Sequence, residues 1–393
     1  MLIFDSRNER YKSKFGAIAD GECITLRLLL PCGGHICCTG AGMLLCRDGE
    51  EYKRYDFKAT EEYDQDCAWW ELDFSIDQPG LYWYYFEFST PHKTFKLYND
   101  GAGKGTLSDD MNTWQLTVYS KNFKTPDWLA GGVIYHIFPD RFFKSGEPKR
   151  NVPDDRVIRS PWGGTPHWEP DAHGKILNND YFGGDLKGIE QKLDYLKSLG
   201  VTCIYMTPIF EAHSNHRYNT ADYLNVDPSL GTAYDFKSLC DAAKKLDIHI
   251  ILDGVFSHTG DDSIYFNKHN RYSSIGAYNS RESKYFDWFK FSNWPHEYES
   301  WWNFSTLPEV CEDNPSYLDF ITGEDGVAAT WLKAGARGWR LDVADELPDI
   351  FIDSLRMRAK SIDPEALILG EVWEDASNKI SYEKRRKYLL GSQ

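Results

Sequence analysis

The sequence predicts an α/β protein: a (β/α)8 TIM-type barrel, incomplete in this chain, that follows an all-β sandwich and carries an inserted loop domain after its third strand. Residues 1 to about 125 contain short apolar strands separated by turn residues. From Gly132 onward, apolar strands alternate with segments of helical period, which is typical of a parallel sheet covered by helices. Acidic residues recur where these strands end, as they do at the carboxyl-terminal face of a barrel.

The N-terminal domain is predicted to span residues 1–125. Its strand candidates follow turn signals and are rich in β-branched and aromatic residues; they are 24–30, 81–88 and 114–119. Period-2 alternation in the second candidate puts Trp83 and Tyr85 on one face, and Tyr82, Tyr84 and Phe86 on the other. Residues 120–129, with a proline, are expected to form a linker.

The catalytic domain is predicted to span residues 126–393, with an irregular aromatic insertion at 256–315. The expected strands are 133–138, 201–206, 248–252, 338–341 and 367–370. The expected helices are 186–199, 233–246, 317–333 and 350–360. A dinucleotide-binding fold is excluded because no G-x-G-x-x-G turn follows a strand. Five strands would leave two sheet edges unpaired.

Charge and composition argue against nucleic-acid and membrane partners. The formal net charge is −16 and no Lys/Arg-rich block offsets it, so no nucleic-acid partner is expected. The longest apolar runs are far below the ~20 residues that span a bilayer, so no membrane partner is expected. The nine cysteines lack the spacing of a zinc site or a disulfide framework. Because the N-terminus lacks the features of a signal peptide, we expect a cytoplasmic location.

The segment from Gly338 to Glu346 carries the strongest chemical signal. Arg340 and Asp342 are two residues apart on a strand, so both side chains lie on one face. The guanidinium is expected to keep the pKa of the carboxyl low and the carboxylate anionic. The next strand candidate ends at Glu371. Two carboxylates at the ends of neighbouring strands are the catalytic groups typical of glycoside hydrolysis. One acts as the nucleophile and the other as the acid/base.

Four motifs, read together and in order, resemble those of the α-amylase family, glycoside hydrolase family 13. They are Asp253-Gly-Val-Phe-Ser-His258, Gly338-Trp-Arg-Leu-Asp342, Gly370-Glu-Val-Trp373, and Tyr181-Phe-Gly-Gly-Asp-Leu-Lys-Gly188 with the later 216–223 segment. The fourth is most similar to the neopullulanase, cyclomaltodextrinase and maltogenic amylase branch.

The resemblance implies a retaining hydrolase of α-glucosidic bonds in maltodextrins, cyclodextrins or pullulan-like α-glucans. By motif position, Asp342 matches the nucleophile and Glu371 the acid/base. Arg340 would hold Asp342 ionised and oriented, and Asp253 would organise the site. The remaining matches would bind the sugar next to the cleaved bond; they are His258, Tyr218 and His216.

Departures from the family pattern leave calcium open as a cofactor. Ser257 stands where many family members have a calcium-binding Asn, and Arg150 would repel a dication at a second calcium loop. Asp185 remains as a candidate calcium ligand. The family's later F-x-x-N-H-D-type motif, which supplies a third carboxylate, has no match after Glu371.

Three alternatives stay open. The chain could be a carbohydrate-binding relative without turnover, a truncated catalytic fragment, or a transglycosylase, in which a sugar hydroxyl replaces water. The expected partner is an α-glucan oligosaccharide. The N-terminal domain is expected to bind glucan or to form a homodimer, as it does in relatives of this branch.

Overall fold

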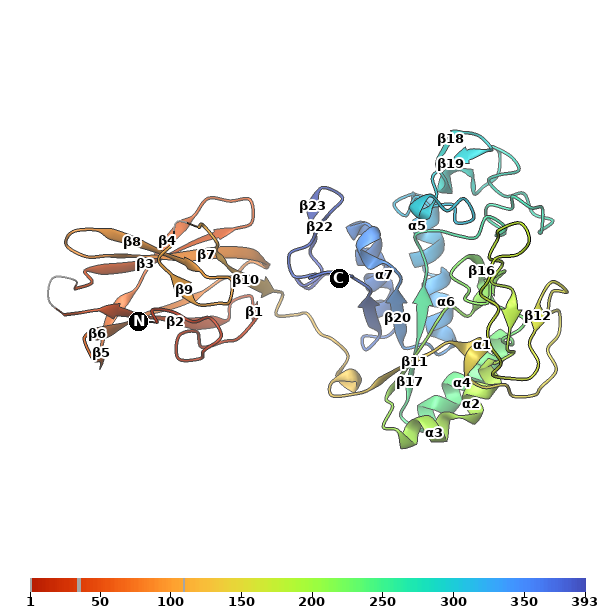
Figure 1. The fold of residues 1–393 in the computed structure, drawn as a ribbon, viewed down its shortest axis with the longest axis horizontal. Coiled ribbons are helices and arrows are strands. Elements are labelled where there is room, and N and C mark those ends of the chain that lie inside the picture. The colour runs from red at the N-terminus through yellow and green to blue at the C-terminus, as the bar shows by residue number, and fades with distance from the viewer. Residues whose placement is uncertain (1, 34–36, 109) are drawn as a thin grey trace. The chain divides into compact units, whose positions relative to one another are not determined.

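The computed structural model describes residues 2–33, 37–108 and 110–393 (Figure 1). Two compact units divide the chain. The first unit combines residues 1–124 with 375–393, and the second holds residues 125–374. Across the described ranges, no helix has the length and apolar character needed to cross a membrane.

Most described strands of the first unit form two largely antiparallel sheets. The larger sheet has the order β1-β10-β7-β3-β4, with β8 and β9 continuing from β7; the smaller has the order β2-β6-β5. Their bounds are β1 Ile18–Ala19, β2 Cys23–Pro31, β3 Gly40–Arg47, β4 Lys53–Asp56, β5 Lys58–Asp64, β6 Cys67–Ser75, β7 Gly80–Ser89, β8 Thr94–Asn99, β9 Gly105–Thr106 and β10 Trp114–Tyr119. The core between the sheets draws buried side chains from both, which is the packing of a β-sandwich.

Strand β7 follows the alternation expected from its sequence. Tyr82, Tyr84 and Phe86 are buried in the core, whereas Trp83 and Tyr85 are only partly buried on the opposite face. The period of two arises because successive side chains of a strand point to opposite sides of the sheet.

Residues 375–393 join the first unit, whereas the sequence placed them in the catalytic domain. This segment contains the hairpin β22 Ile380–Ser381 and β23 Lys384–Arg385. The Arg385 guanidinium pairs with Asp48 at 2.7 Å, and the backbone N–H of Ser120 donates to the carbonyl of Leu390. The compact units therefore differ from the predicted 126–393 domain at this end of the chain.

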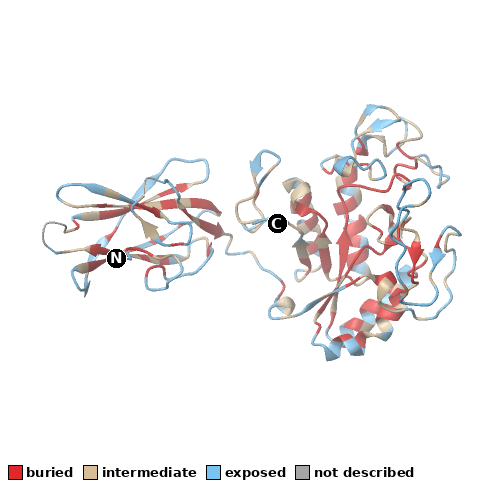
Figure 2. Cartoon of the chain, viewed as in Figure 1, coloured by how far each residue is buried: buried red, intermediate tan, exposed pale blue. Residues whose placement is uncertain are grey.

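The second unit is built on a parallel sheet of five strands in the order β11-β14-β17-β20-β21. The strands are β11 Ile134–Ile137, β14 Cys203–Met206, β17 His249–Gly254, β20 Gly338–Leu341 and β21 Leu367–Gly370. Strands adjacent in this order also follow one another in the chain, with helices between them, which is how a (β/α) barrel is wound. Most residues of the three central strands are buried (Figure 2).

The helices lie in the connections between these strands. Their bounds are α1 Pro139–Phe142, α2 Leu186–Gln191, α3 Leu193–Ser198, α4 Ala233–Lys245, α5 Pro315–Thr322, α6 Val327–Ala334 and α7 Asp349–Ile362. Helix α4 begins with a capping box in which Thr232 and Asp235 satisfy each other's backbone N–H groups. Small additional sheets pair β12 Val157–Ile158 with β13 Asp180–Tyr181, and β15 Phe210–Ala212 with β16 Thr220–Val226.

Two helices expected to be continuous are each divided. The 186–199 helix breaks at Lys192, which joins α2 to α3 with φ −104° and ψ 6°. The 317–333 helix breaks between Gly323 and Gly326, where extended backbone separates α5 from α6. Apolar residues continue at helical spacing across Lys192, as Ile189, Leu193 and Leu196, and so hide the first break. The second break falls in 322–326, where two glycines interrupt the apolar pattern.

The 256–315 insertion after β17 is largely irregular. Its regular pieces are the hairpin β18 Phe291–Asn293 and β19 Glu297–Tyr298, with 3-10 turns at Phe286–Trp288 and Trp301–Asn303. Clustered rings order the rest, with Phe266 contacting Phe289 and Tyr298 at centroid distances of 4.9 and 4.8 Å. The insertion therefore has a small aromatic core of its own.

Candidate active site

Arg340 gathers three carboxylates at the carboxyl-terminal end of the parallel sheet. Its Nη1 lies 2.7 Å from an oxygen of Asp253 and 2.7 Å from an oxygen of Asp342, while its Nη2 lies 2.7 Å from Oε2 of Glu371. The sheet register explains this meeting, because Asp253 of β17 is paired with Arg340 of β20, and Asp342 and Glu371 follow the ends of β20 and β21. Asp342 and Glu371, which lie 89 and 118 positions after Asp253 in the chain, thus share one guanidinium with it.

Gly338 allows strands β20 and β21 to approach closely. It has φ +156°, and a Cβ added there would lie 2.2 Å from the carbonyl oxygen of Leu367. Only a residue without a side chain fits between the strands. Gly338 thereby sets the spacing that brings the residues following β20 next to Glu371.

Two tyrosines hold Asp253. The hydroxyls of Tyr205 and Tyr218 both donate to its Oδ2, at 2.5 and 2.9 Å, while Arg340 binds its other oxygen. Asp253 is almost fully buried, and both of its carboxylate oxygens bind protein groups. The arrangement assigns it to organising the cluster.

Val343 has a strained backbone between the two carboxylates predicted to react. It adopts φ 39° and ψ 55°, a left-handed conformation that is costly for a β-branched residue. In this conformation its backbone N–H donates to Oε2 of Glu371 at 3.1 Å. The turn after Asp342 thus also orients the carboxylate of Glu371.

Asp342 does not have the low pKa expected from its neighbouring Arg. Burial and the nearby charge of Asp253 raise the pKa of Asp342 to about 7, although Arg340 acts in the opposite direction. The expectation of a low pKa follows from Arg340 and Asp342 taken as an isolated pair. In the folded protein three carboxylates share that guanidinium, so the positive charge does not offset them all.

This raised pKa predicts a pH-dependent stabilisation by Asp342→Asn. The ordinary Asp pKa is 3.8 and the folded one about 7, so folding stability is lost as pH rises between these values. Because asparagine carries no charge, the variant should exceed the parent in unfolding free energy by about 2–4 kcal/mol at pH 8.5, and by about half of that at pH 5.5. Denaturant titration at both pH values measures the difference. A parent as stable as the variant at pH 8.5 would contradict the prediction.

Of the predicted histidines, His258 is buried and His216 is half-buried, and both are neutral near pH 7. His258 has Nε2 3.1 Å from the carbonyl oxygen of Tyr218 and Nδ1 3.0 Å from Oγ of Ser257. His216 accepts the backbone N–H of Tyr218 on Nδ1 at 3.1 Å. Burial lowers the pKa of each histidine to about 4. Both rings thus border Tyr218, which links them to Asp253 and the carboxylate cluster.

Asp185 does not fit a calcium ligand. One carboxylate oxygen caps helix α2 by accepting the N–H of Gly188 at 2.6 Å, and the other binds the Lys149 ammonium at 2.9 Å and the Ser145 hydroxyl at 2.6 Å. An ammonium group therefore occupies the position that a dication would need. Within the described ranges, no group of three or more His, Cys, Asp or Glu side chains is arranged to hold a metal ion.

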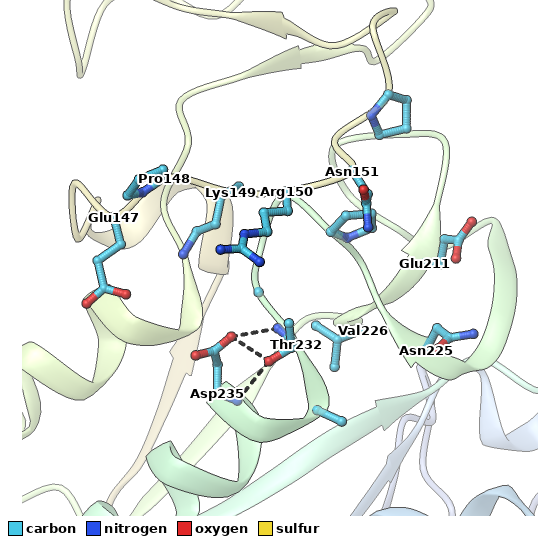
Figure 3. A pocket seen from close by; sticks show the side chains of 14 residues that line it. Glu147, Pro148, Lys149, Arg150, Asn151, Glu211, Asn225, Val226, Thr232 and Asp235 are labelled. Carbon is cyan, nitrogen blue, oxygen red and sulfur yellow. Dashed lines mark hydrogen bonds between the residues drawn. The ribbon is translucent and has the colours of Figure 1, made fainter.

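A cavity of about 800 Å³ lies at the start of helix α4, and its lining includes none of the predicted catalytic or substrate-binding residues. Figure 3 shows that Lys149, Arg150, Glu211 and Asp235 surround it, so both signs of charge face the space. Asp235 is engaged by Thr232 in the capping box. The carboxylates that contact Arg340, Asp342 and Glu371 among them, therefore do not line this cavity.

Sequence reasoning missed two parts of the site. Tyr205 gave a weak signal, as a hydroxyl inside a short apolar strand. Glu346 ends the 338–346 segment and has no role in its motif, yet its carboxylate accepts the indole N–H groups of Trp301 and Trp302. These contacts join the insertion to the turn after β20, over sequence separations of 45 and 44 residues that no local pattern reveals.

Residues 136–389 match the family model described as alpha amylase, catalytic domain. The chain belongs to the alpha-amylase family. This family member is 38% identical to an amylopullulanase of Thermoanaerobacterium saccharolyticum, across 96% of this chain and 32% of that protein. It is 39% identical to neopullulanase 2 of Thermoactinomyces vulgaris, across 70% of this chain and 43% of that protein.

Among solved structures, this alpha-amylase family member is similar to the type III pullulan hydrolase from Thermococcus kodakarensis. The TM-score is 0.56 at 27% identity, over 95% of this chain and 62% of that one. The family and this neighbour assign the second unit to the (β/α)8 barrel class, and the described part of the unit holds a sheet of five parallel strands. The chain spans 22–32% of the length of the amylopullulanases that it matches.

Proposed function

We propose that this protein hydrolyses α-glucosidic bonds in maltodextrins, cyclodextrins or pullulan-like α-glucans with retention of anomeric configuration. The observation that carries the proposal is the convergence of Asp342 and Glu371 on one guanidinium. Because each binds a nitrogen of Arg340, the two carboxyls lie near each other, as a retaining mechanism requires (about 5–5.5 Å). The names of the relatives, amylopullulanase and neopullulanase, support an α-glucan as substrate.

In the first step, a carboxylate oxygen of ionised Asp342 attacks the anomeric carbon while the bond to the leaving glycosidic oxygen breaks. Protonated Glu371 transfers its proton to that oxygen, so the leaving sugar departs as a neutral alcohol. The products of this step are a covalent glycosyl–Asp342 ester and ionised Glu371.

In the second step, Glu371 removes a proton from water as the water oxygen attacks the anomeric carbon. The ester bond to Asp342 breaks, and both carboxyls return to their starting states. Arg340 keeps its positive charge between them throughout and offsets the negative charge that moves from one to the other. If a sugar hydroxyl takes the place of water, the same chemistry gives transglycosylation.

Reducing-sugar release from maltohexaose, pullulan and γ-cyclodextrin by the purified chain tests this function. We expect turnover on at least one substrate and none with Asp342→Asn, and NMR of the first product should show the α anomer. Initial formation of the β anomer would contradict the retaining mechanism. Binding of maltohexaose without turnover would favour the carbohydrate-binding alternative instead.

The oligomeric state and the cellular location of the protein are two further expectations. A homodimer through the N-terminal domain stays a prediction that sedimentation of the purified chain would measure. A cytoplasmic location also stays a prediction; its support is the similarity to an intracellular maltogenic amylase of Bacillus subtilis, 35% identical over 65% of this chain.

A further inference from the structure

Three tryptophan rings form an aromatic face that runs from His258 to the segment after Glu371. The ring of Trp301 lies 5.2 Å from His258 and 5.6 Å from Trp302, and the ring of Trp302 lies 6.3 Å from Trp373, two residues after Glu371. Trp302 and Trp373 are 62% and 70% exposed. Large apolar rings left in water at a reactive site suit the C–H face of a sugar.

Glu346 holds two of these rings. Its Oε2 accepts the Nε1–H of Trp301 at 2.6 Å, and its Oε1 accepts the Nε1–H of Trp302 at 3.0 Å. Hydrogen bonds to a carboxylate are stronger than those between neutral groups. Because each carboxylate oxygen takes one indole, both the position and the tilt of the pair are constrained, at 33° between the rings.

The backbone of the insertion is strained where it presents these rings. Trp302 has φ 49° and ψ 32°, and the next residue, Asn303, has φ 64°. A bulky residue in the left-handed region is an outlier that persists only where surrounding contacts fix it. The bond to Glu346 is such a contact, since it ties Trp302 to the turn that follows β20.

We propose that Glu346 is a positioning residue that holds Trp301 and Trp302 as a fixed stacking face for a glucose ring beside Glu371. The inference rests on the proposed function, and it places the stacked sugar on the leaving-group side, because Glu371 protonates the leaving oxygen. Glu346 thus acts through the indoles and not through contact with the glucan. A flexible pair of rings would lose rotamer freedom on binding, whereas the held pair has already lost it.

A double-mutant cycle separates this role from direct contact with the sugar. Maltoheptaose affinity is measured by calorimetry in the Asp342→Asn background, which prevents turnover, for Glu346→Gln, Trp302→Phe and the double variant. Phenylalanine retains a ring but cannot donate to Glu346. We expect each single change to weaken binding of maltoheptaose about fivefold to tenfold. The double variant should have about the same affinity as whichever single variant binds less tightly. Fully additive losses would overturn the proposal and favour direct contact.

A second measurement remains informative if the chain neither binds nor cleaves glucan, which would contradict the proposed function itself. The indole Nε1–H groups of Trp301 and Trp302, followed by 15N NMR, should exchange slowly with solvent in the parent and at least about tenfold faster in Glu346→Gln. Unchanged exchange would overturn the positioning role. Glu324→Gln removes the same charge from an exposed position after α5 and serves as the control.

Discussion

Glutamine in place of Glu371 is expected to lower turnover of maltohexaose by about 10³-fold. The neutral amide cannot protonate the leaving oxygen, and general acid catalysis contributes typically 10²–10⁴-fold. It also cannot deprotonate water in the second step, so the glycosyl–Asp342 ester should be slow to hydrolyse. Steady-state kinetics on maltohexaose measures the first effect.

An activated substrate distinguishes this role from general damage to the site. Fluoride leaves without protonation, so α-maltosyl fluoride should still react with Glu371→Gln in a rapid burst. Mass spectrometry should then show the protein carrying one maltosyl group. Glu374→Gln, three residues further on and exposed, is the matched control and should behave as the parent. Equal losses on both substrates would contradict the acid/base assignment.

The second large effect is expected from Arg340→Met, which should destabilise the second unit by about 3–5 kcal/mol at pH 8. The substitution leaves Asp253, Asp342 and Glu371 without their shared cation. Removing one partner of a buried ion pair is costly because the remaining charge is neither solvated nor neutralised. The loss should be smaller at pH 5, where buried carboxyls with raised pKa values take up protons.

Amide hydrogen exchange of strands β17 and β20 reports this loss for the second unit alone. Lys237→Met is the matched control, because Lys237 and Asp241 form an exposed ion pair on α4, 58% exposed on each side. Surface pairs of this kind contribute about 0–1 kcal/mol. If Arg340→Met and Lys237→Met lower the free energy of unfolding by the same amount, the carboxylates would have to be stabilised by groups other than Arg340.

Much of the catalytic unit was predictable because its signals are local. Each strand of the parallel sheet is a short apolar run, and the carboxyl ends of parallel strands meet at one edge of a sheet. The sequence therefore predicts that Asp253, Asp342 and Glu371 gather at one edge of the sheet. The strand at 133–138 was found within one residue at each end, as Ile134–Ile137.

The remaining features depend on contacts between distant segments. The break at Lys192 lies inside continuous apolar periodicity, so the pattern predicts one helix where the structure has two. The pairing of Arg385 with Asp48 joins positions 337 residues apart. A sequence pattern carries no information about such a contact, and it could not assign residues 375–393 to the first unit.

By itself, the sequence determined which side chains are the candidates for the chemistry and at which strand ends they stand, because strand period and chain order are local properties. Only the tertiary structure decided the pKa values of these side chains and the contacts that hold the residues around them. The pKa of Asp342 is raised since burial and Asp253 act together against one guanidinium, and Glu346 reaches Trp301 and Trp302 since the insertion folds back onto the turn after β20. Electrostatic energy depends on distance and burial in space, and neither can be read from positions along the chain.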